Sequence, residues 1–420
     1  MTEQFDPYLI DLGKKAKKAS NILRKASEQA KNDALNKMAD RLIEEQDKIL
    51  AANQRDLETG KANGLTDSLL ERLTLTEARI EGMANGLRQM VTLPDPLLVA
   101  KKQWINKDGL KITQQPVPLG VIGIIYESRP NVTVDASGLS IKSGNAVILR
   151  GGKEALESNL AIVDILQASL EDSELSKESV QLINNPSREL ASQFMRLNQY
   201  VDCLIPRGGA GLIQAVIKQA TVPVIETGVG NCHLYIHEAA DINKAKDILL
   251  NGKVQRDSVC NALETLVIDE SVAREELGQL VVALKEYHVE VRGDDKARSI
   301  IEGLEEATEA DFQTEFLDSI LAVKVTSSYD EAIEHIATYS TGHSDAIVTE
   351  NYSVAQDFLR DVDSAVVYVN TSTRFTDGEM FGFGGEMGIS TQKLHARGPM
   401  GLEALTSYKY TVEGSGQIRQ

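Results

Sequence analysis

The chain has 420 residues, of which 42% are hydrophobic and 25% charged, a composition typical of a globular protein with two or three domains. Its net charge of −18 argues against sequence-independent binding of nucleic acid or anionic membrane. We find no apolar run of membrane-spanning length, no secretory signal and only three cysteines, too few for a disulfide framework. We therefore expect a cytoplasmic protein without a metal.

The first hundred residues have a helical pattern. Apolar side chains recur at helical steps, as in Ile80, Met83 and Leu87, until two prolines at 94 and 96 end the block. Residues 104–112 follow, with an Asp-Gly pair between extended arms, which predicts a β-hairpin.

From Pro118 onward, predicted strands alternate with predicted helices. We place strands at residues 121–126, 146–149, 179–183, 203–205, 222–225, 263–268, 320–325, 366–369 and 407–412. We place helices at residues 135–142, 159–170, 210–219, 241–253, 273–287 and 329–339. This alternation predicts an α/β fold with mostly parallel sheets, in which ligands bind beyond the carboxyl ends of the strands.

Cys260 lies in a polar stretch between a predicted helix and a predicted strand, close to Arg256. A cysteine held between rigid elements near a cation could be kept partly as the reactive thiolate. A small buried hydrophobic side chain is the alternative, and Cys260 on its own does not decide between the two.

Glycine-rich turns are candidate sites for a phosphate-bearing ligand. Gly151 and Gly152 lie between Arg150 and Lys153 directly after the strand at 146–149. The other such turns contain Gly208, Gly228 and Phe383. Backbone amides at a helix start would suit an anion, although solvated turns are the alternative and no complete Gly-x-Gly-x-x-Gly fingerprint is present.

A second candidate anion site follows the strand at 366–369. Ser372, Thr373 and Arg374 place two hydroxyls beside a guanidinium, which suits a carboxylate or a phosphate. An arginine on an exposed loop is the alternative interpretation.

The order of these pieces resembles the aldehyde dehydrogenase superfamily over nearly the whole chain. A glutamate, Glu226, ends a predicted strand and is followed by a glycine loop and then by Cys260; the pair Glu315-Phe316 and a late Phe-Gly-Gly come after it. Within the superfamily, residues 127–133, 335–345, 370–378 and 390–402 resemble the gamma-glutamyl phosphate reductase family.

The resemblance implies NADPH-dependent reduction of L-glutamate 5-phosphate to L-glutamate 5-semialdehyde with release of phosphate, through a cysteine thioester, in proline biosynthesis. It implies that Cys260 is the nucleophile, Glu315 holds the nicotinamide ribose, and Arg150 with Lys153 pairs with the NADPH 2′-phosphate. Asn131 is the candidate side-chain oxyanion donor, because Ser128 stands where hydrolytic relatives have an asparagine. Predicted cofactor contacts are Arg150, Gly151, Gly152, Lys153, Gly208, Gly228, Glu315 and Phe383, and predicted substrate contacts are Arg256, Ser372, Thr373 and Arg374.

The resemblance also implies two Rossmann-type α/β domains and a small β element that bridges subunits. We assign residues 1–103 and 119–228 to the cofactor-binding domain, 229–400 to the catalytic domain, and 104–118 with 401–420 to the bridging element. A homo-oligomer follows, supplied with acyl phosphate by a separate glutamate kinase. The alternatives are a hydrolytic NAD(P)-dependent aldehyde dehydrogenase with Glu226 as base, and a non-catalytic binding or scaffold subunit.

Overall fold

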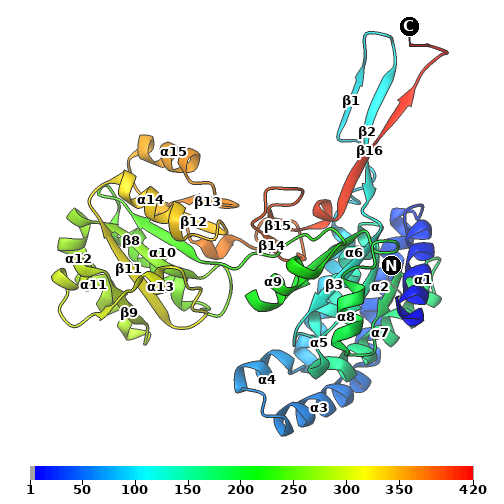
Figure 1. The fold of residues 1–420 in the computed structure, drawn as a ribbon, viewed down its shortest axis with the longest axis horizontal. Coiled ribbons are helices and arrows are strands. Elements are labelled where there is room, and N and C mark those ends of the chain that lie inside the picture. The colour runs from blue at the N-terminus through cyan, green and yellow to red at the C-terminus, as the bar shows by residue number, and fades with distance from the viewer. Residues whose placement is uncertain (1–4, 420) are drawn as a thin grey trace. The chain divides into compact units, whose positions relative to one another are not determined.

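The structure of this protein is a computed structural model that describes residues 5–419. The chain divides into two compact units: Met1–Thr227 with Gly382–Gly388 and Met400–Gln420, and Gly228–Phe381 with Ile389–Pro399 (Figure 1). Residues 1–4 and 420, which the sequence assigned to the cofactor-binding domain and to the bridging element, lie outside the described residues.

The first unit is built on a parallel sheet of strand order β5-β4-β3-β6. Its strands are β3 (Val121–Tyr126), β4 (Ala146–Arg150), β5 (Val180–Leu182) and β6 (Cys203–Arg207). Its helices are α1 (Pro7–Leu23), α2 (Glu28–Glu44), α3 (Gln46–Ala62), α4 (Asp67–Leu73), α5 (Glu77–Thr92), α6 (Asn131–Lys142), α7 (Leu156–Glu171), α8 (Arg188–Phe194) and α9 (Ala210–Gln219). Every residue of β3 is buried, as expected for the inner strand of a covered parallel sheet.

The helical block predicted for the first hundred residues is confirmed. In α5 the buried side chains are Ile80, Met83, Leu87 and their helical neighbours, so one apolar face points into the core. Thr76 caps this helix by accepting a hydrogen bond from the amide of Arg79. The helices α2 and α5 pack against each other and against α6, which in turn packs on the sheet.

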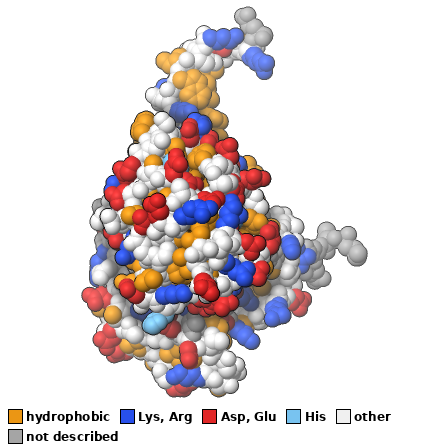
Figure 2. Space-filling view, turned by 90° about the vertical axis from the view of Figure 1, so that its left-hand side faces the viewer, with side chains coloured by type: hydrophobic (Ala, Val, Ile, Leu, Met, Phe, Trp, Pro, Cys, Tyr) orange, Lys and Arg blue, Asp and Glu red, His pale blue; other side chains and the backbone are white. Residues whose placement is uncertain are grey.

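An antiparallel arm extends from the first unit, with strand order β1-β2-β16 (Figure 1). It consists of β1 (Lys102–Ile105), β2 (Lys111–Pro118) and β16 (Thr406–Glu413), and it confirms the predicted hairpin and terminal strand. Figure 2 shows apolar side chains on this arm. Trp104, Ile105, Tyr410 and Val412 are exposed members of that set.

The second unit is built on a larger parallel sheet, of order β10-β9-β11-β8-β7-β12-β13 within the described residues. Its strands are β7 (Cys232–Ile236), β8 (Leu263–Asp269), β9 (Glu290–Gly293), β10 (Glu305–Glu306), β11 (Ile320–Thr326), β12 (Ser344–Val348) and β13 (Val366–Val369), with a separate pair, β14 (Ile389–Ser390) and β15 (Gly398–Pro399). Its helices are α10 (Ile242–Val254), α11 (Glu270–Glu286), α12 (Asp295–Ile300), α13 (Glu309–Phe312), α14 (Tyr329–Tyr339) and α15 (Tyr352–Asp361). The predicted α/β class with parallel sheets is therefore confirmed.

Two predicted elements need correction, and two strands were missed. The predicted strand at 222–225 is wrong, because only Val224 forms an isolated bridge, to Leu204. The amide of Ile225 donates to Leu204 O, but Pro223 has no N–H to extend the ladder. The helix expected from residue 135 begins at Asn131, directly after Pro130. The strands β7 and β12 were not predicted at all.

Candidate functional site

Cys260 lies in the loop between α10 and β8 in the second unit, and its side chain is half-buried. The three cysteines all lie within the described residues, and no disulfide joins any of them. The residue after Cys260, Asn261, is held by two hydrogen bonds. Its Nδ2 donates to Thr376 O at 3.0 Å, and Thr373 Oγ1 donates to its carbonyl oxygen at 2.7 Å. These bonds hold the loop that carries Cys260 to the segment after β13.

Gly230 lies between Cys260 and Glu315. Its amide donates to Glu315 Oε1 at 2.7 Å, and a Cβ on Gly230 would lie only 1.5 Å from the carbonyl oxygen of Cys260. Burial raises the pKa of the Glu315 carboxyl, and the bond from Gly230 acts against this increase. Only glycine allows the backbone to approach the Cys260 carbonyl this closely.

A buried polar chain lies behind Cys260. Cys232 Sγ donates to the carbonyl oxygen of Cys260 at 3.2 Å, and it lies 3.7 Å from His343 Nδ1. Burial raises the pKa of the Cys232 thiol well above its ordinary value and lowers that of His343 to about 4. Both groups are therefore neutral near pH 7, and Cys232 serves here as a hydrogen-bond donor to the loop.

The predicted substrate residues lie near Cys260 in the second unit. Arg374 belongs to the short 3-10 helix Thr373–Phe375, and its Nε donates to Gln255 Oε1 at 3.2 Å. Burial is the main cause that lowers the pKa of Arg374, and the positive charge of Arg256 lowers it further. The sulfur of Cys260 acts in the opposite direction. Ser372 Oγ accepts from the Arg374 amide at 3.3 Å. The structure therefore brings Arg256, Ser372, Thr373 and Arg374 together around the loop of Cys260.

In the first unit, the predicted phosphate-binding turns follow neighbouring strands. Arg150 ends β4 and Gly208 follows the end of β6, and both strands pair with β3 in parallel. Their carboxyl ends therefore lie at one edge of the sheet, on either side of β3, where α/β proteins bind nucleotides. The Gly209 amide donates to Glu127 Oε2 at 2.9 Å at the end of β3.

The turn after β4 is compatible with a bound cofactor. Arg150 is partly buried and donates to Pro186 O at 3.1 Å, whereas the Lys153 side chain is exposed. Gly151 lies against Asn159, whose Nδ2 atom is buried and has no hydrogen-bond partner among the described residues. Gly152 is also closely packed by a neighbouring side chain, since a Cβ at this position would lie 2.0 Å from Glu154 Oε1.

Three other predicted site residues, Asn131, Phe383 and Gly228, have contacts of their own. Asn131 is exposed at the start of α6 in the first unit, and its Nδ2 donates to Asp135 Oδ2 at 3.1 Å. Phe383 belongs to the first unit and lies against Gly401. Gly228 begins the second unit, where its amide donates to Ile389 O at 2.7 Å.

Sequence reasoning missed Gly230 and Cys232, which contact the Cys260 loop, and Lys253 and Glu264, which lie at its two ends. Gly230 belongs to a short Gly-x-Gly turn and Cys232 is followed by a histidine, and neither pattern on its own indicates a role. Lys253 and Glu264 form an ion pair of 2.7 Å in which both side chains are fully buried. A charged residue inside the otherwise apolar strand after Cys260 was the signal that could have found this pair.

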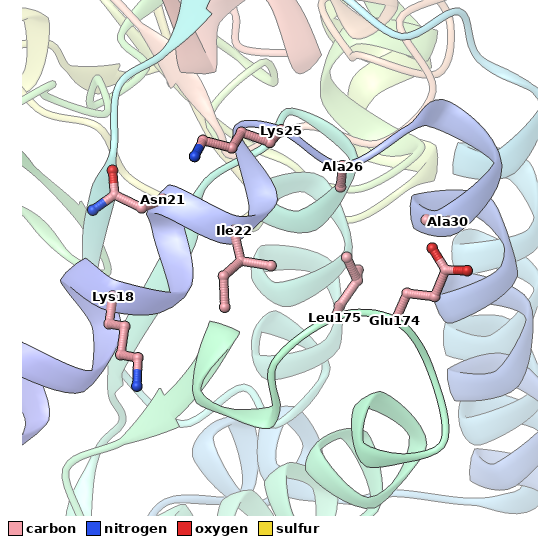
Figure 3. Close-up of a pocket in the computed structure, with 8 residues that line it drawn as sticks. All are labelled: Lys18, Asn21, Ile22, Lys25, Ala26, Ala30, Glu174 and Leu175. Carbon is pink, nitrogen blue, oxygen red and sulfur yellow. The ribbon is translucent and has the colours of Figure 1, made fainter.

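The first unit also has a surface hollow (Figure 3). Its volume is about 450 Å³, and it lies between α1, the start of α2 and residues 174 and 175. Ile22 and Leu175 form its apolar part, with Lys18, Lys25 and Glu174 at its sides. None of the predicted catalytic, cofactor or substrate residues lines it.

Comparison with known proteins connects this geometry to a family. A model described as "Aldehyde dehydrogenase family" matches residues 10–303 and 299–411. The chain is 56% identical to the gamma-glutamyl phosphate reductases of Heliobacterium modesticaldum, over 97% of this chain and 98% of the relative, and of Clostridium botulinum strain Alaska E43, over 98% and 99%. The crystal structure of gamma-glutamyl phosphate reductase from Thermotoga maritima has a TM-score of 0.96 at 48% identity, covering 98% of this chain and 100% of that one. An acetylating aldehyde dehydrogenase from Geobacillus thermoglucosidasius, at 17% identity and a TM-score of 0.72, shares the fold.

Proposed function

Because the chain belongs to the aldehyde dehydrogenase family and, within it, to the gamma-glutamyl phosphate reductases, we propose that it reduces L-glutamate 5-phosphate with NADPH. The products are L-glutamate 5-semialdehyde, NADP⁺ and phosphate. This is a reductive step of proline biosynthesis. The observation that carries the proposal is the position of Cys260, on a loop that contains Arg256, is hydrogen-bonded to the Cys232 thiol and to the segment after β13, and lies beside Arg374.

The Cys260 thiolate attacks the γ-carbonyl carbon of the acyl phosphate. A carbon–sulfur bond forms, the bond from carbon to the phosphate oxygen breaks, and phosphate leaves with the electron pair. Arg374, whose charge interacts with the sulfur of Cys260, and Arg256, which lies near Arg374 and on the Cys260 loop, stabilise the departing phosphate. The backbone amide of Cys260 donates to the oxyanion of the tetrahedral intermediate, with Asn131 as the side-chain donor.

Bound NADPH supplies the hydride that converts the resulting thioester to the aldehyde. Arg150 and Lys153 pair with its 2′-phosphate, and Glu315 binds the nicotinamide ribose. The remaining cofactor contacts are Gly151, Gly152, Gly208, Gly228 and Phe383. Support comes from the parallel strand ends of the first unit and from the unpartnered Nδ2 atom of Asn159 beside Gly151.

The proposal also includes an oligomer, a kinase that supplies the substrate, and a cytoplasmic location. The exposed apolar residues of the arm are covered by a second copy of the chain, since open edges and apolar patches of this kind form interfaces. A separate glutamate kinase supplies the acyl phosphate, and three cysteines without a disulfide suit the reducing cytoplasm. Among the described residues, no helix is long and apolar enough to cross a membrane.

Phosphate dependence in the reverse direction tests the reaction. We expect the purified protein to reduce NADP⁺ with glutamate 5-semialdehyde only when phosphate is present. NADP⁺ reduction at an equal rate without phosphate would instead identify a hydrolytic aldehyde dehydrogenase, in which Glu226 activates water. Analytical ultracentrifugation of the same sample tests the oligomer, and a monomer at micromolar concentration would reject it.

A further inference from the structure

Lys253 and Glu264 form a buried ion pair that the proposed mechanism does not use. Lys253 Nζ lies 2.7 Å from Glu264 Oε2, and neither side chain is exposed to solvent. Lys253 lies in the last turn of α10 and Glu264 is the second residue of β8, so the pair joins the two ends of the loop that carries Cys260.

The second oxygen of Glu264 binds a different loop. Glu264 Oε1 accepts a hydrogen bond of 3.2 Å from the amide of Leu317, two residues after Glu315. Leu317 has a φ of +53°, a left-handed conformation that is strained for a leucine and needs support from its surroundings. Glu264 thus fixes the strained backbone next to Glu315.

The same two loops are tied at a second point. Ser319 Oγ donates to Asp257 Oδ2 at 2.6 Å, which joins the segment after Glu315 to the segment before Cys260. Gly230 completes the arrangement, since it binds Glu315 and lies against the Cys260 carbonyl. Glu264 adds a buried, charged link to this set, because it binds Lys253 at one end of the Cys260 loop and the Leu317 amide in the Glu315 loop.

Stability alone is a weak reason for this pair. Two well-packed apolar side chains of similar volume commonly replace a buried ion pair without loss of stability. What such side chains cannot supply is a directional acceptor for the Leu317 amide. The specific contribution of Glu264 is therefore the position of the loop that carries Glu315.

We propose that Lys253 and Glu264 are a positioning pair that sets Glu315 relative to Cys260, and so aligns the nicotinamide ring with the thioester. The inference rests on the roles of Cys260 and Glu315 in the proposed function. Glu264 acts through Glu315 and touches neither the substrate nor the cofactor.

Two variants separate positioning from stability. Glu264→Gln keeps an acceptor for Leu317 but leaves Lys253 without its counter-charge, whereas Lys253→Met with Glu264→Leu removes both charges and keeps the volume. The matched control is Glu350→Gln, which removes one charge of the exposed Lys244–Glu350 pair in the same unit. Thermal unfolding and steady-state kinetics are measured for each variant.

We expect the apolar double variant to unfold within a few degrees of the wild type, yet to show a KM for NADP⁺ raised about tenfold, with the KM for semialdehyde changed less than twofold. Recovery of wild-type kinetics in this variant would overturn the proposal, because the pair would then be only structural. If the apolar double variant does not fold, Glu264→Gln decides: alone it should raise the KM for NADP⁺ by about threefold or more, because the buried Lys253 loses its counter-charge and the side chain at 264 is displaced, and an unchanged KM would overturn the proposal. Glu264→Gln is also combined with Glu315→Gln, and we expect the combination to raise the KM for NADP⁺ no further than Glu315→Gln alone. Multiplying effects would also overturn the proposal.

A measurement without turnover keeps this test separate from the proposed function. Iodoacetamide alkylation of Cys260 is followed with and without NADP⁺, and we expect bound cofactor to alter the rate in the wild type and in Glu350→Gln. In the double variant the same change should need about tenfold more NADP⁺. An inactive wild type that still shows this difference would reject the proposed reaction and leave the positioning role supported. Equal NADP⁺ requirements in all three proteins would reject the positioning role.

Discussion

The amide of Gly230 donates a hydrogen bond of 2.7 Å to Glu315 Oε1. The same glycine lies against the carbonyl oxygen of Cys260, so one small residue is the shared neighbour of the proposed nucleophile and of the proposed ribose ligand. Adding a side chain at this position would disturb both at once, because the nearest atoms belong to the backbone and cannot rotate away.

Gly230→Ala tests this contact directly. We expect kcat to fall at least tenfold, since the new methyl group would displace the loop of Cys260. The control is Gly86→Ala in α5, where nothing lies within 4 Å of the new Cβ and alanine favours the helix by about 1 kcal/mol. Activity in Gly230→Ala equal to that of the control would show that the close approach has no catalytic consequence.

Cys260→Ala removes the proposed nucleophile. We expect turnover to fall by about 10³-fold or more, because no other group can form the thioester. Cys203→Ala is the matched control: Cys203 is buried in β6, and burial raises its pKa to about 12. Initial-rate assays and mass spectrometry of iodoacetamide-treated protein provide the readout. Retained turnover in Cys260→Ala would eliminate covalent catalysis.

Arg374→Met tests the site of the departing phosphate. A hydrogen bond to a charged group contributes about 1.5–3 kcal/mol, so we expect the KM for phosphate in the reverse reaction to rise about 10- to 100-fold. The KM for NADP⁺ should change less than twofold. Arg360→Met is the control, because Arg360 is exposed and pairs with its helix neighbours Asp357 and Asp361. Equal KM values in the two variants would remove Arg374 from the substrate site.

Arg150→Ala combined with Lys153→Ala tests cofactor choice. Loss of two cations at the end of β4 should lower the ratio of kcat/KM for NADPH over NADH by about tenfold or more, since NADH lacks the 2′-phosphate. Lys14→Ala with Arg24→Ala removes the same charge from exposed positions in and just after α1 and should leave the ratio unchanged. An unaltered ratio in the first variant would assign NADPH selectivity to other residues.

The buried carboxyl of Glu264 predicts a pH dependence of stability. Burial, opposed by Lys253, raises its pKa to about 7, above the ordinary value of 4.5. Between these values the folded protein binds more protons than the unfolded chain, so this group makes stability fall as pH rises toward 7. Its contribution is at most about 3 kcal/mol.

Urea unfolding at pH 5 and pH 7.5 measures the effect. We expect the midpoint of the wild type to fall by more over this interval than that of Lys253→Met with Glu264→Leu, which has no titrating group at these positions. The exposed-pair variant Glu350→Gln should follow the wild type. Identical pH dependence in all three proteins would assign the titration to other groups.

The sequence predicted elements well where apolar patterns were unambiguous. The strands at 121–126 and 366–369 and the helix at 329–339 have the predicted bounds. Strands β7 and β12 were missed because polar residues interrupt them. The structure explains why such residues are tolerated: Asp345 in β12 accepts a hydrogen bond from the His233 amide in β7, so two buried polar groups satisfy each other across the sheet.

The candidate site was predictable only in part, because some of its residues are buried polar groups whose partners are distant in the sequence or across a loop. Cys260 and Arg374 were predicted from their positions next to strands and loops, and Glu315 from the resemblance to the family. The supporting residues were not predicted, because Lys253 and Glu264 form an ion pair only in the folded protein, where the loop between them brings the two side chains together. Periodicity reports which face of an element is buried, but it does not identify the partner of a buried charge.

The order in which the chain is synthesised has a consequence for the first unit. The last segment of this unit, Met400–Gln420, follows the second unit in the sequence. Until that segment emerges from the ribosome, β2 has no partner along the edge that β16 later covers, and Asn145 Nδ2 lacks one of its acceptors, Leu405 O. The nascent protein therefore carries an open, partly apolar strand edge throughout synthesis of the second unit, and it is in this interval that the chain is most exposed to misassembly with its own copies.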